Sequence, residues 1–595
     1  MATQWSTFPI EFRGGLISNM SALQHGTNAV GSATILQNFE PNKEGGYSKV
    51  KGYEKFSTTV VPGSGPIRAL KVMSSGRVIA ARHNASSETE YYYGTGTTWT
   101  SMGSTVGTNG GKVRHVEFNF TGTDKVVFVD GTNYPVVYDS SNNTIDLLDA
   151  TDSTDLSAVE NVAIFKNTAF YSKGNNIFFT APFSVDDFDV GNGAGTINVG
   201  TDVIGLAVFR DQLIIFTTNS IKRLTGNTSA DFQLSPITDR IGCINGDTIQ
   251  EVGGDILYLA PDGLRLISAT DRIGDFALDV ASDKIQKDAI TFLGTASIFS
   301  SVILRDKAQY RIFSYIESEQ QSVAKGLIAT KFISQGAAGM SWATTKGIKA
   351  YIADSRYAVD QETVAFANED GYIYIMDTGN TFDSNIIEAI YESPFMPISD
   401  PQIRKTFYKM TLYAEPTGNM NLDVNLKYDF ASATNTKKIQ PPTFNITSTG
   451  NAVFEFGSSS SVYTDAQTFT ATAGQTAFTL QDVPYTVGTD TDKVVVKIND
   501  VATTAFTVAS VADGDNYDVT VTLTSGATLD DAVYVELEPP AVSEPATYGG
   551  ELDNIYQTNV TGSGKTVALR IEDNSTNPTF TLDTALLEFS QNDRQ

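Results

Sequence analysis

The segment Gly562-Ser563-Gly564-Lys565-Thr566 has the residue types of a phosphate-binding loop. In such a loop, backbone N–H groups hold the phosphates, while the lysine and the hydroxyl reach the terminal phosphates and a magnesium ion. The complete motif also needs glycine at position 559, where Asn559 stands, and a helix after Thr566. Strand-like residues 567–571 follow instead, so we expect a hairpin turn here and no nucleotide site.

Histidine and cysteine, which supply most general bases and zinc ligands, are scarce. The sequence contains only His25, His83 and His115, together with the single Cys243. None of the histidines stands beside a nucleophile motif, and His115 alternates within a strand-like stretch. A cluster of Cys and His ligands cannot be formed from this supply. We therefore predict that the protein is not an enzyme, has no catalytic, cofactor-binding or metal site, and needs no cofactor.

Two acidic stretches and one aromatic stretch leave alternatives open. Asp186-Asp187-Phe188-Asp189 and Asp513-Gly514-Asp515 could offer carboxylate oxygens to Ca²⁺, although aspartate-rich surface turns are the commoner cause. Tyr91-Tyr92-Tyr93 with Trp99 could stack on a sugar, although β-strands are rich in aromatic residues anyway. We expect surface turns in the first case and packing within a β-sheet in the second.

The elements that must position these residues are almost all β-strands. Between residues 67 and 383, an apolar strand, a Gly/Asn/Asp turn and a second apolar strand recur, as at Asp130-Gly131 and Asp262-Gly263. The recurring units start near Ile67, Val113, Val162, Val203, Thr248, Ile298 and Val364. The first five starts are roughly 45 residues apart, which is the length of a four-stranded propeller blade. We predict an all-β protein in which residues 67–393 form a β-propeller of six or seven blades; the alternative is a two-layer sandwich with long connections.

The sequence pattern changes after Pro394. Period-two alternation over 405–413 and 420–428 predicts half-buried strands, and strand patterns return at 566–571 and 585–589. We predict one C-terminal β-sandwich, formed by residues 394–462 and 540–595 and interrupted by a small fibre-like β-module over 463–539. That module carries 12 Asp or Glu residues and 2 Lys, and insertion at a loop tip is the simplest account of it. Residues 1–66 form an N-terminal leader and docking segment in this scheme.

The charge balance and the cysteine count restrict partners and compartment. With 41 basic and 68 acidic residues, the net charge is −27, which disfavours gripping nucleic acid through its phosphates. The single Cys243 excludes an intrachain disulfide and fits assembly in a reducing cytoplasm. No signal peptide and no apolar run of about 20 residues are visible, so we expect no membrane-spanning segment.

The residues 33–56 carry a resemblance to a known family. The pair Asn38-Phe39, the Gly45-Gly46 turn and Lys49-x-x-Gly52-Tyr53 resemble the N-terminal region of tail nozzle, or tail hub, proteins of short-tailed bacteriophages. The segments 220–224, 241–243 and 257–263 look like the propeller of the same family, and 472–478 resembles small β-modules of phage tail fibres. The sequence departs from the family at its end, where 590–595 hold a single Arg594 in place of a more basic terminus.

The resemblance implies a structural virion protein. It implies a homohexameric ring at the distal end of a short tail, assembled in the host cytoplasm, that extends and gates the DNA ejection channel. The implied partners are the portal-adaptor proteins of the tail, fibres or spikes, and double-stranded DNA that passes without sequence-specific binding. It also implies an assembly role for Asn38, Phe39, Gly52 and Tyr53. An acidic channel wall would repel phosphates and give ejected DNA low friction.

Two other functions remain as alternatives. The protein could be a receptor- or glycan-binding tail appendage, with module 463–539 as its binding head. It could also be a propeller-type polysaccharide depolymerase, which would need two carboxylates about 5 to 10 Å apart in a cleft. The sequence does not identify the residues that line a channel.

Overall fold

The computed structural model describes most of the chain and divides it into two compact units. The described residues are 5–21, 24, 26–27, 29–103, 107–148, 155–268, 280–294, 296–334, 337–358, 361–430, 436–439, 466–483, 485–513, 516–537 and 554–591. The first unit comprises Met1–Pro441 with Leu552–Gln595, and the second comprises Pro442–Glu551. His25, Asp515 and Arg594 lie outside the described residues.

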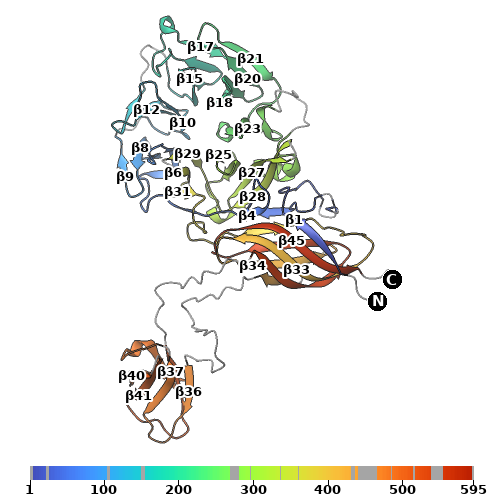
Figure 1. The fold of residues 1–595 in the computed structure, drawn as a ribbon. Coiled ribbons are helices and arrows are strands. Elements are labelled where there is room, and N and C mark those ends of the chain that lie inside the picture. The colour runs from blue at the N-terminus through green and yellow to red at the C-terminus, as the bar shows by residue number, and fades with distance from the viewer. Residues whose placement is uncertain are drawn as a thin grey trace. The chain divides into compact units, whose positions relative to one another are not determined.

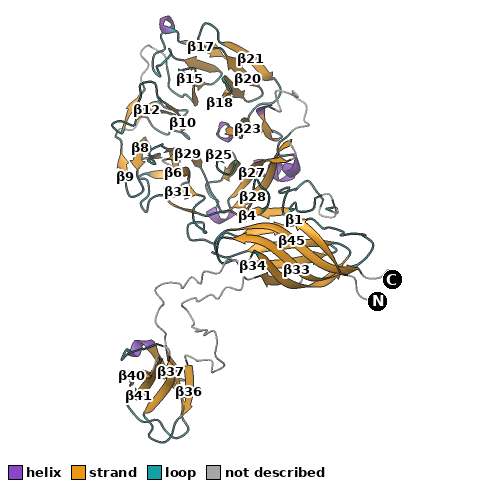
Figure 2. Ribbon diagram, in the orientation of Figure 1, coloured by secondary structure: helices purple, strands orange, loops and turns teal. Residues whose placement is uncertain are grey.

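The larger part of the first unit is a ring of antiparallel sheets (Figures 1 and 2). Within the described residues, seven sheets follow one another in chain order. The first sheet contains β6 (Ser64–Val72), β7 (Val78–His83), β8 (Thr89–Gly94) and β9 (Trp99–Ser101), and the second contains β10 (Arg114–Phe118), β11 (Lys125–Val129), β12 (Val136–Asp139) and β13 (Thr144–Leu147). The third sheet contains β14 (Asn161–Phe165), β15 (Thr168–Lys173), β16 (Asn176–Phe179) and β17 (Gly195–Asn198). The fourth sheet contains β18 (Val203–Phe209), β19 (Gln212–Thr217), β20 (Ile221–Thr225) and β21 (Gln233–Thr238). The fifth sheet contains β22 (Gln250–Val252), β23 (Asp255–Ala260) and β24 (Gly263–Leu266). The sixth contains β25 (Ile298–Leu304), β26 (Gln309–Tyr315), β27 (Lys325–Ser334) and β28 (Ala337–Lys346). The seventh contains β29 (Ile352–Ala358), β30 (Gln361–Ala367), β31 (Ile373–Met376) and, from the leader, β5 (Tyr53–Lys55).

Apolar side chains between successive sheets close this ring. Tyr91 of the first sheet packs on Phe128 of the second at 5.4 Å between ring centroids, and Phe216 of the fourth packs on Tyr258 of the fifth at 5.3 Å. One buried cluster contains residues of the sixth, seventh and first sheets, so the last sheet meets the first. Successive sheets packed face to face around an axis are a β-propeller, as the repeat spacing predicts.

The predicted hairpins are confirmed by the strand pairing. Val127 pairs with Val137, Leu259 pairs with Leu264, and Phe366 lies opposite Tyr374. Alternation of β-branched and aromatic residues around Asx-type and Asp-Gly turns is sufficient to fix this local pairing.

The C-terminal strands form two further layers with strands of the leader (Figure 1). A six-stranded sheet has the order β3 (Phe39–Pro41), β4 (Tyr47–Lys49), β45 (Phe580–Gln591), β33 (Lys405–Pro416) and β43 (Ile555–Gly564), with β1 (Trp5–Glu11) also paired to β45. The sixth sheet of the ring continues through β2 (Ile35–Gln37), β32 (Ala389–Glu392), β44 (Val567–Asp573) and β34 (Leu422–Tyr428) to β35 (Thr436–Ile439). Residues 1–66 therefore contribute strands both to these layers and to the ring.

The segment Gly562–Thr566 is not a hairpin turn, so that expectation was wrong. Gly562–Gly564 are the last residues of β43 in the six-stranded sheet, and Lys565 and Thr566 connect it to β44 of the other sheet, with which β43 does not pair. Asp429 Oδ1 accepts hydrogen bonds from the backbone N–H groups of Lys565 and Thr566 at 2.7 and 3.1 Å. The strand β44 follows directly, so the segment lacks the helix N-terminus that a phosphate-binding loop requires.

The second unit is a small β-sandwich with its own core. One sheet has the order β36 (Ala466–Thr470), β42 (Ala532–Leu537), β38 (Val494–Ile498) and β39 (Val501–Thr503). The other has the order β37 (Ala477–Val483), β41 (Asn516–Leu523) and β40 (Phe506–Asp513). Val496, Val519 and Val535 are among the residues buried between the sheets.

Helices are few in the described residues. They are η1 (Val190–Asn192), η2 (Gly246–Thr248), η3 (Asp283–Ile285), α2 (Gln286–Leu293), η4 (Gln321–Val323) and η5 (Thr491–Lys493). None that the structure describes has the length and apolar character needed to cross a membrane.

Candidate functional site

Asn38 lies at the junction of leader, ring and C-terminal layers. Its backbone takes a left-handed φ of 52°, and its side chain is 1% exposed. The amide nitrogen donates to the carbonyl oxygens of Lys346 and Glu388 at 3.0 and 2.9 Å. The amide oxygen accepts from the Thr345 hydroxyl and from the Lys346 N–H at 3.0 and 2.9 Å. Asn38 thus joins the end of β28 to the segment before β32.

The other residues of the leader motif are also buried within the chain. Phe39 packs edge-on against Phe580 of β45. Gly52 is needed because a Cβ atom there would lie 2.0 Å from the carbonyl oxygen of Thr381. Tyr53 stacks on Phe382 with 4.9 Å between ring centroids and donates to the Gly347 carbonyl at 3.1 Å. Burial raises the pKa of the Tyr53 hydroxyl well above its usual value.

These four residues therefore anchor the leader inside its own chain. The side chains of Asn38, Phe39 and Tyr53 and the backbone of Gly52 all contact other parts of the same chain, so their expected role in assembly stays a prediction. Asn38 and Tyr53 also line a pocket of about 560 Å³, together with Gln321, Lys346 and Glu388.

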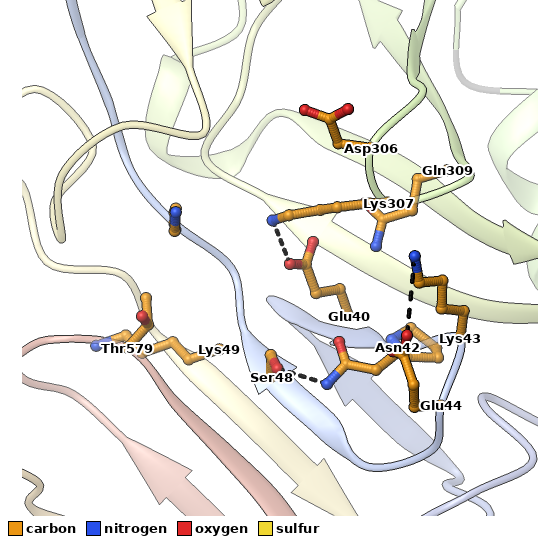
Figure 3. A pocket seen from close by; sticks show the side chains of 12 residues that line it. Glu40, Asn42, Lys43, Glu44, Ser48, Lys49, Asp306, Lys307, Gln309 and Thr579 are labelled. Atoms are coloured by element: carbon orange, nitrogen blue, oxygen red, sulfur yellow. Dashed lines mark hydrogen bonds and ion pairs between the residues drawn. The ribbon is translucent and has the colours of Figure 1, made fainter. Parts of the chain in front are cut away.

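A second pocket, of about 300 Å³, lies beside β3 and β4 and is shown in Figure 3. Buried Glu40 on its wall accepts from Lys307 Nζ at 2.6 Å and from Arg311 Nη2 at 2.7 Å. Lys307 Nζ also lies 2.6 Å from Asp377 Oδ1. Burial alone would raise the pKa of Asp377, but Arg311 and Lys307 hold it below its usual value. This network ties the leader to the sixth and seventh sheets.

Basic residues next to and within β10 reach across the centre of the ring. Arg114 Nε lies 2.8 Å from Asp247 Oδ1, and Lys112 Nζ lies 3.1 Å from Asp247 Oδ2. Asp247 belongs to η2, which connects the fourth sheet to the fifth, whereas β10 belongs to the second. Lys112 also donates to the carbonyl of Phe299 in the sixth sheet at 2.9 Å. Burial would raise the pKa of Asp247, but the two cations hold it well below its usual value.

A second group of charges links the first, second and seventh sheets. Lys71 Nζ lies 3.4 Å from Asp354 Oδ2 and 3.8 Å from Glu117 Oε2, and Arg356 pairs with Glu117. His115 Nε2 lies 3.8 Å from Asp354. Burial and the charge of Lys71 lower the pKa of His115 to about 4, so the imidazole is neutral at pH 7. Ion pairs between sheets that are not neighbours mean that side chains occupy the centre of the ring.

This arrangement stabilises the ring and offers little for hydrolysis. A glycoside hydrolase needs one protonated carboxyl and one free carboxylate facing the substrate. At the ring centre, the carboxylates of Asp247, Glu117 and Asp354 all contact cations instead. Among the residues with described positions, no group of three or more His, Cys, Asp or Glu side chains is arranged to hold a metal ion.

The remaining candidate residues lie apart from the leader junction and from the ring centre. Tyr91 and Tyr92 are buried in the first sheet, which confirms packing as their role, and the Trp99 indole donates to the Thr59 carbonyl at 3.0 Å. Asp187 accepts from the Asp189 N–H at 3.0 Å within a surface turn, as expected. His83 contacts the Gly110 carbonyl at 3.1 Å, and burial lowers its pKa.

Sequence reasoning missed the ion pairs of the ring centre. The signal was present in Lys112 and Arg114, two positions apart on one face of the strand-like stretch, and in His115 and Glu117, two positions apart on the other face. Charged residues at such positions ordinarily indicate contact with solvent, and only the closed ring gives them partners in other sheets.

Comparisons with known proteins reveal distant structural likeness only. No family model matches the chain, and no curated protein matches it. An extracellular domain of a B. thetaiotaomicron one-component system is 10% identical, with a TM-score of 0.34, over 60% of this chain and 43% of that one. The Neurospora crassa Pan2 WD40 domain is 8% identical, with a TM-score of 0.34, over 55% of this chain and 97% of that one. An ancestral GH74 enzyme is 10% identical, with a TM-score of 0.34, over 57% of this chain and 53% of that one. The chain thus spans less than half of the first of these proteins, and the propeller assignment rests on the strand pairing itself.

Proposed function

We propose that the protein is a structural virion subunit that forms the distal nozzle of a short phage tail. In this role, six copies surround and gate the DNA ejection channel, contact the portal-adaptor proteins and carry fibres or spikes. The resemblance of residues 33–56 to nozzle proteins motivates the proposal.

The placement of the leader is the observation that carries it. Strands β1, β3 and β4 pair in the six-stranded sheet, β2 joins the ring sheet to the C-terminal strands, and β5 completes the last ring sheet. The leader therefore fastens ring and C-terminal layers into one body. Parts joined by continuous strand pairing suit a wall that must resist pressure, whereas an enzyme needs an open cleft with free catalytic groups.

The closed ring centre restricts where DNA could pass. Because the Arg114–Asp247 and Lys112–Asp247 ion pairs cross the centre of the ring, duplex DNA cannot go through a single subunit. A channel must instead be enclosed by several copies. The net charge of −27 on each copy supports a wall that repels phosphates.

Microscopy of the purified full chain tests this proposal. We expect rings of six subunits with a central opening wide enough for duplex DNA, and we expect the same rings at the tail tip of the particle. A protein that stays monomeric at concentrations of about 100 µM, well above typical subunit dissociation constants, would contradict it.

A receptor-binding appendage is the second candidate function, because the second unit has its own hydrophobic core. Replacing residues 466–537 by a short Gly/Ser linker separates the two. A nozzle should still form rings and retain DNA without the module. Lost attachment to the host cell, with normal rings, would assign receptor binding to the module.

A further inference from the structure

One loop of the ring exposes large apolar side chains to solvent. This apical loop, residues 180–194, connects β16 to β17 and contains η1, at the end of the ring far from the C-terminal layers (Figures 1 and 2). Phe183 is 64% exposed and Val190 is 76% exposed. The Phe183 ring makes one distant edge contact, 6.1 Å from Phe120 between centroids.

The backbone of Phe183 is strained in addition. Its φ is 61°, in the left-handed region that a bulky residue with a Cβ atom seldom adopts. Glycine or asparagine would occupy this position at lower cost in free energy. The chain thus holds an aromatic residue in a costly conformation and leaves its ring in water. Strain of this kind is concentrated at functional positions.

Hydrogen bonds hold the backbone of the apical loop on both sides of Phe183. The Phe183 N–H donates to the Asn167 carbonyl at 2.7 Å, and the Thr180 hydroxyl donates to the Ser184 carbonyl at 2.8 Å. The Tyr171 hydroxyl donates to the Val185 carbonyl at 2.8 Å. Phe188 turns inward, where it is 5% exposed. A hydrogen-bonded backbone reduces the entropy that the loop loses on binding, which suits the exposed Phe183 to the role of a binding hot spot.

The charges of the apical loop indicate what kind of surface fits it. Residues 182–194 contain Asp186, Asp187 and Asp189 and no Lys or Arg. In the described part of the chain, no salt bridge neutralises Asp187 or Asp189, whose carboxylates accept hydrogen bonds from the loop itself. A second copy of this chain, with 68 acidic and 41 basic residues, would bring mostly like charge.

We propose that the apical loop is a docking knob for a different protein, which offers an apolar socket bordered by Lys or Arg side chains. Phe183 fills the socket, Val190 extends the apolar contact, and the neighbouring aspartates face the basic border. The inference rests on the loop alone and holds whether or not the protein is a tail nozzle.

Photo-crosslinking of the full chain in the cells that produce it identifies the partner. Phe183 is replaced by p-benzoylphenylalanine, and Ile290, which is 56% exposed on α2, is replaced in a matched control. We expect an adduct from position 183 with a different polypeptide, at a peptide that holds apolar and basic residues, and no such adduct from position 290. An adduct with a second copy only, with an acidic peptide, or no adduct beyond the control would overturn the proposal.

Binding of the crosslinked partner to purified variants then tests the mechanism. Asparagine accepts the left-handed conformation, so Phe183→Asn keeps the turn and removes the ring. We expect it to weaken binding by about tenfold or more, while raising the melting temperature of the free protein because strain is relieved. Leu147→Ser, at a site that is 48% exposed outside the loop, should stay within about twofold of wild type.

The charge of the loop is tested separately. Asp187→Asn removes one charge and keeps one oxygen to accept from the Asp189 N–H, so we expect about threefold weaker binding and a smaller dependence on salt. If Phe183→Asn binds like wild type, the knob is not the binding site. If Asp187→Asn binds like wild type at low salt, the socket has no basic border.

Discussion

At the scale of single residues, Asn38 shows how one side chain can fix a junction. Asn38→Ala removes four hydrogen bonds, three of which go to the partly buried backbone of Lys346 and Glu388, and leaves the Glu388 carbonyl with the bond from Gln37 Nε2 at 3.3 Å. We expect a loss of about 3–5 kcal/mol in the free energy of unfolding, measured by urea titration. Asn109 also has a positive φ, of 56°, but is exposed. Asn109→Ala should therefore cost only about 1 kcal/mol, and equal losses for the two variants would contradict this account.

His115 should make stability depend on pH. Its pKa is about 4 in the folded chain, because burial and Lys71 disfavour the cation, against about 6.5 when unfolded. Between pH 4 and pH 6.5, the unfolded chain therefore binds a proton at His115 that the folded chain does not bind. The stability contribution is complete above pH 6.5 and is lost as the pH falls toward 4.

The expected loss for His115 is at most about 3 kcal/mol. Other groups titrate in the same range, so the useful measurement is the difference in unfolding free energy between wild type and His115→Gln. We expect this difference to fall between pH 7 and pH 4.5. A difference that does not change with pH would show that His115 titrates normally.

At the scale of elements, the ion pairs from β10 to η2 should behave as buried pairs. Asp247→Asn removes the carboxylate that pairs with both Lys112 and Arg114, which are 14% and 32% exposed, and we expect it to cost about 3–5 kcal/mol. The pair Lys166–Asp211 is the control, because Asp211 is 86% exposed. Asp211→Asn should cost less than about 1 kcal/mol in the same urea titration. Similar costs for both would mean that the ring centre is filled with water.

The elements differ in how far the sequence predicts them. The hairpins of the ring follow from local alternation and turns, and their pairing was predicted. The strands β2 and β5 have three residues each, too few to show a period, and they pair with Thr344 and with residues 374–376, more than 300 positions later. The connection at Gly562–Thr566 was predicted as a hairpin because a short polar turn between two strands does not reveal which sheet receives the second strand.

The candidate site shows the same limit. Asn38 and Tyr53 stand out in the sequence, but nothing local indicates that Lys346, Glu388 and Phe382 would surround them. Phe183 lies in a loop whose sequence gives no sign of a left-handed backbone at that position. Contacts between residues far apart in the sequence determine both features, and local sequence patterns do not predict such contacts.

At the scale of the whole molecule, the net charge of −27 should govern assembly. If several copies form a ring, as proposed, their negative charges come close together, and the repulsion between them opposes assembly. Salt shortens the range of this repulsion, from a Debye length of about 30 Å at 10 mM to about 8 Å at 150 mM. We therefore expect ring formation to strengthen as NaCl rises from about 10 to 150 mM, with the ring fraction measured by analytical ultracentrifugation. Rings that dissociate as salt is added over this range would show that attraction between opposite charges holds the copies together, and that the acidic surface faces away from the subunit contacts.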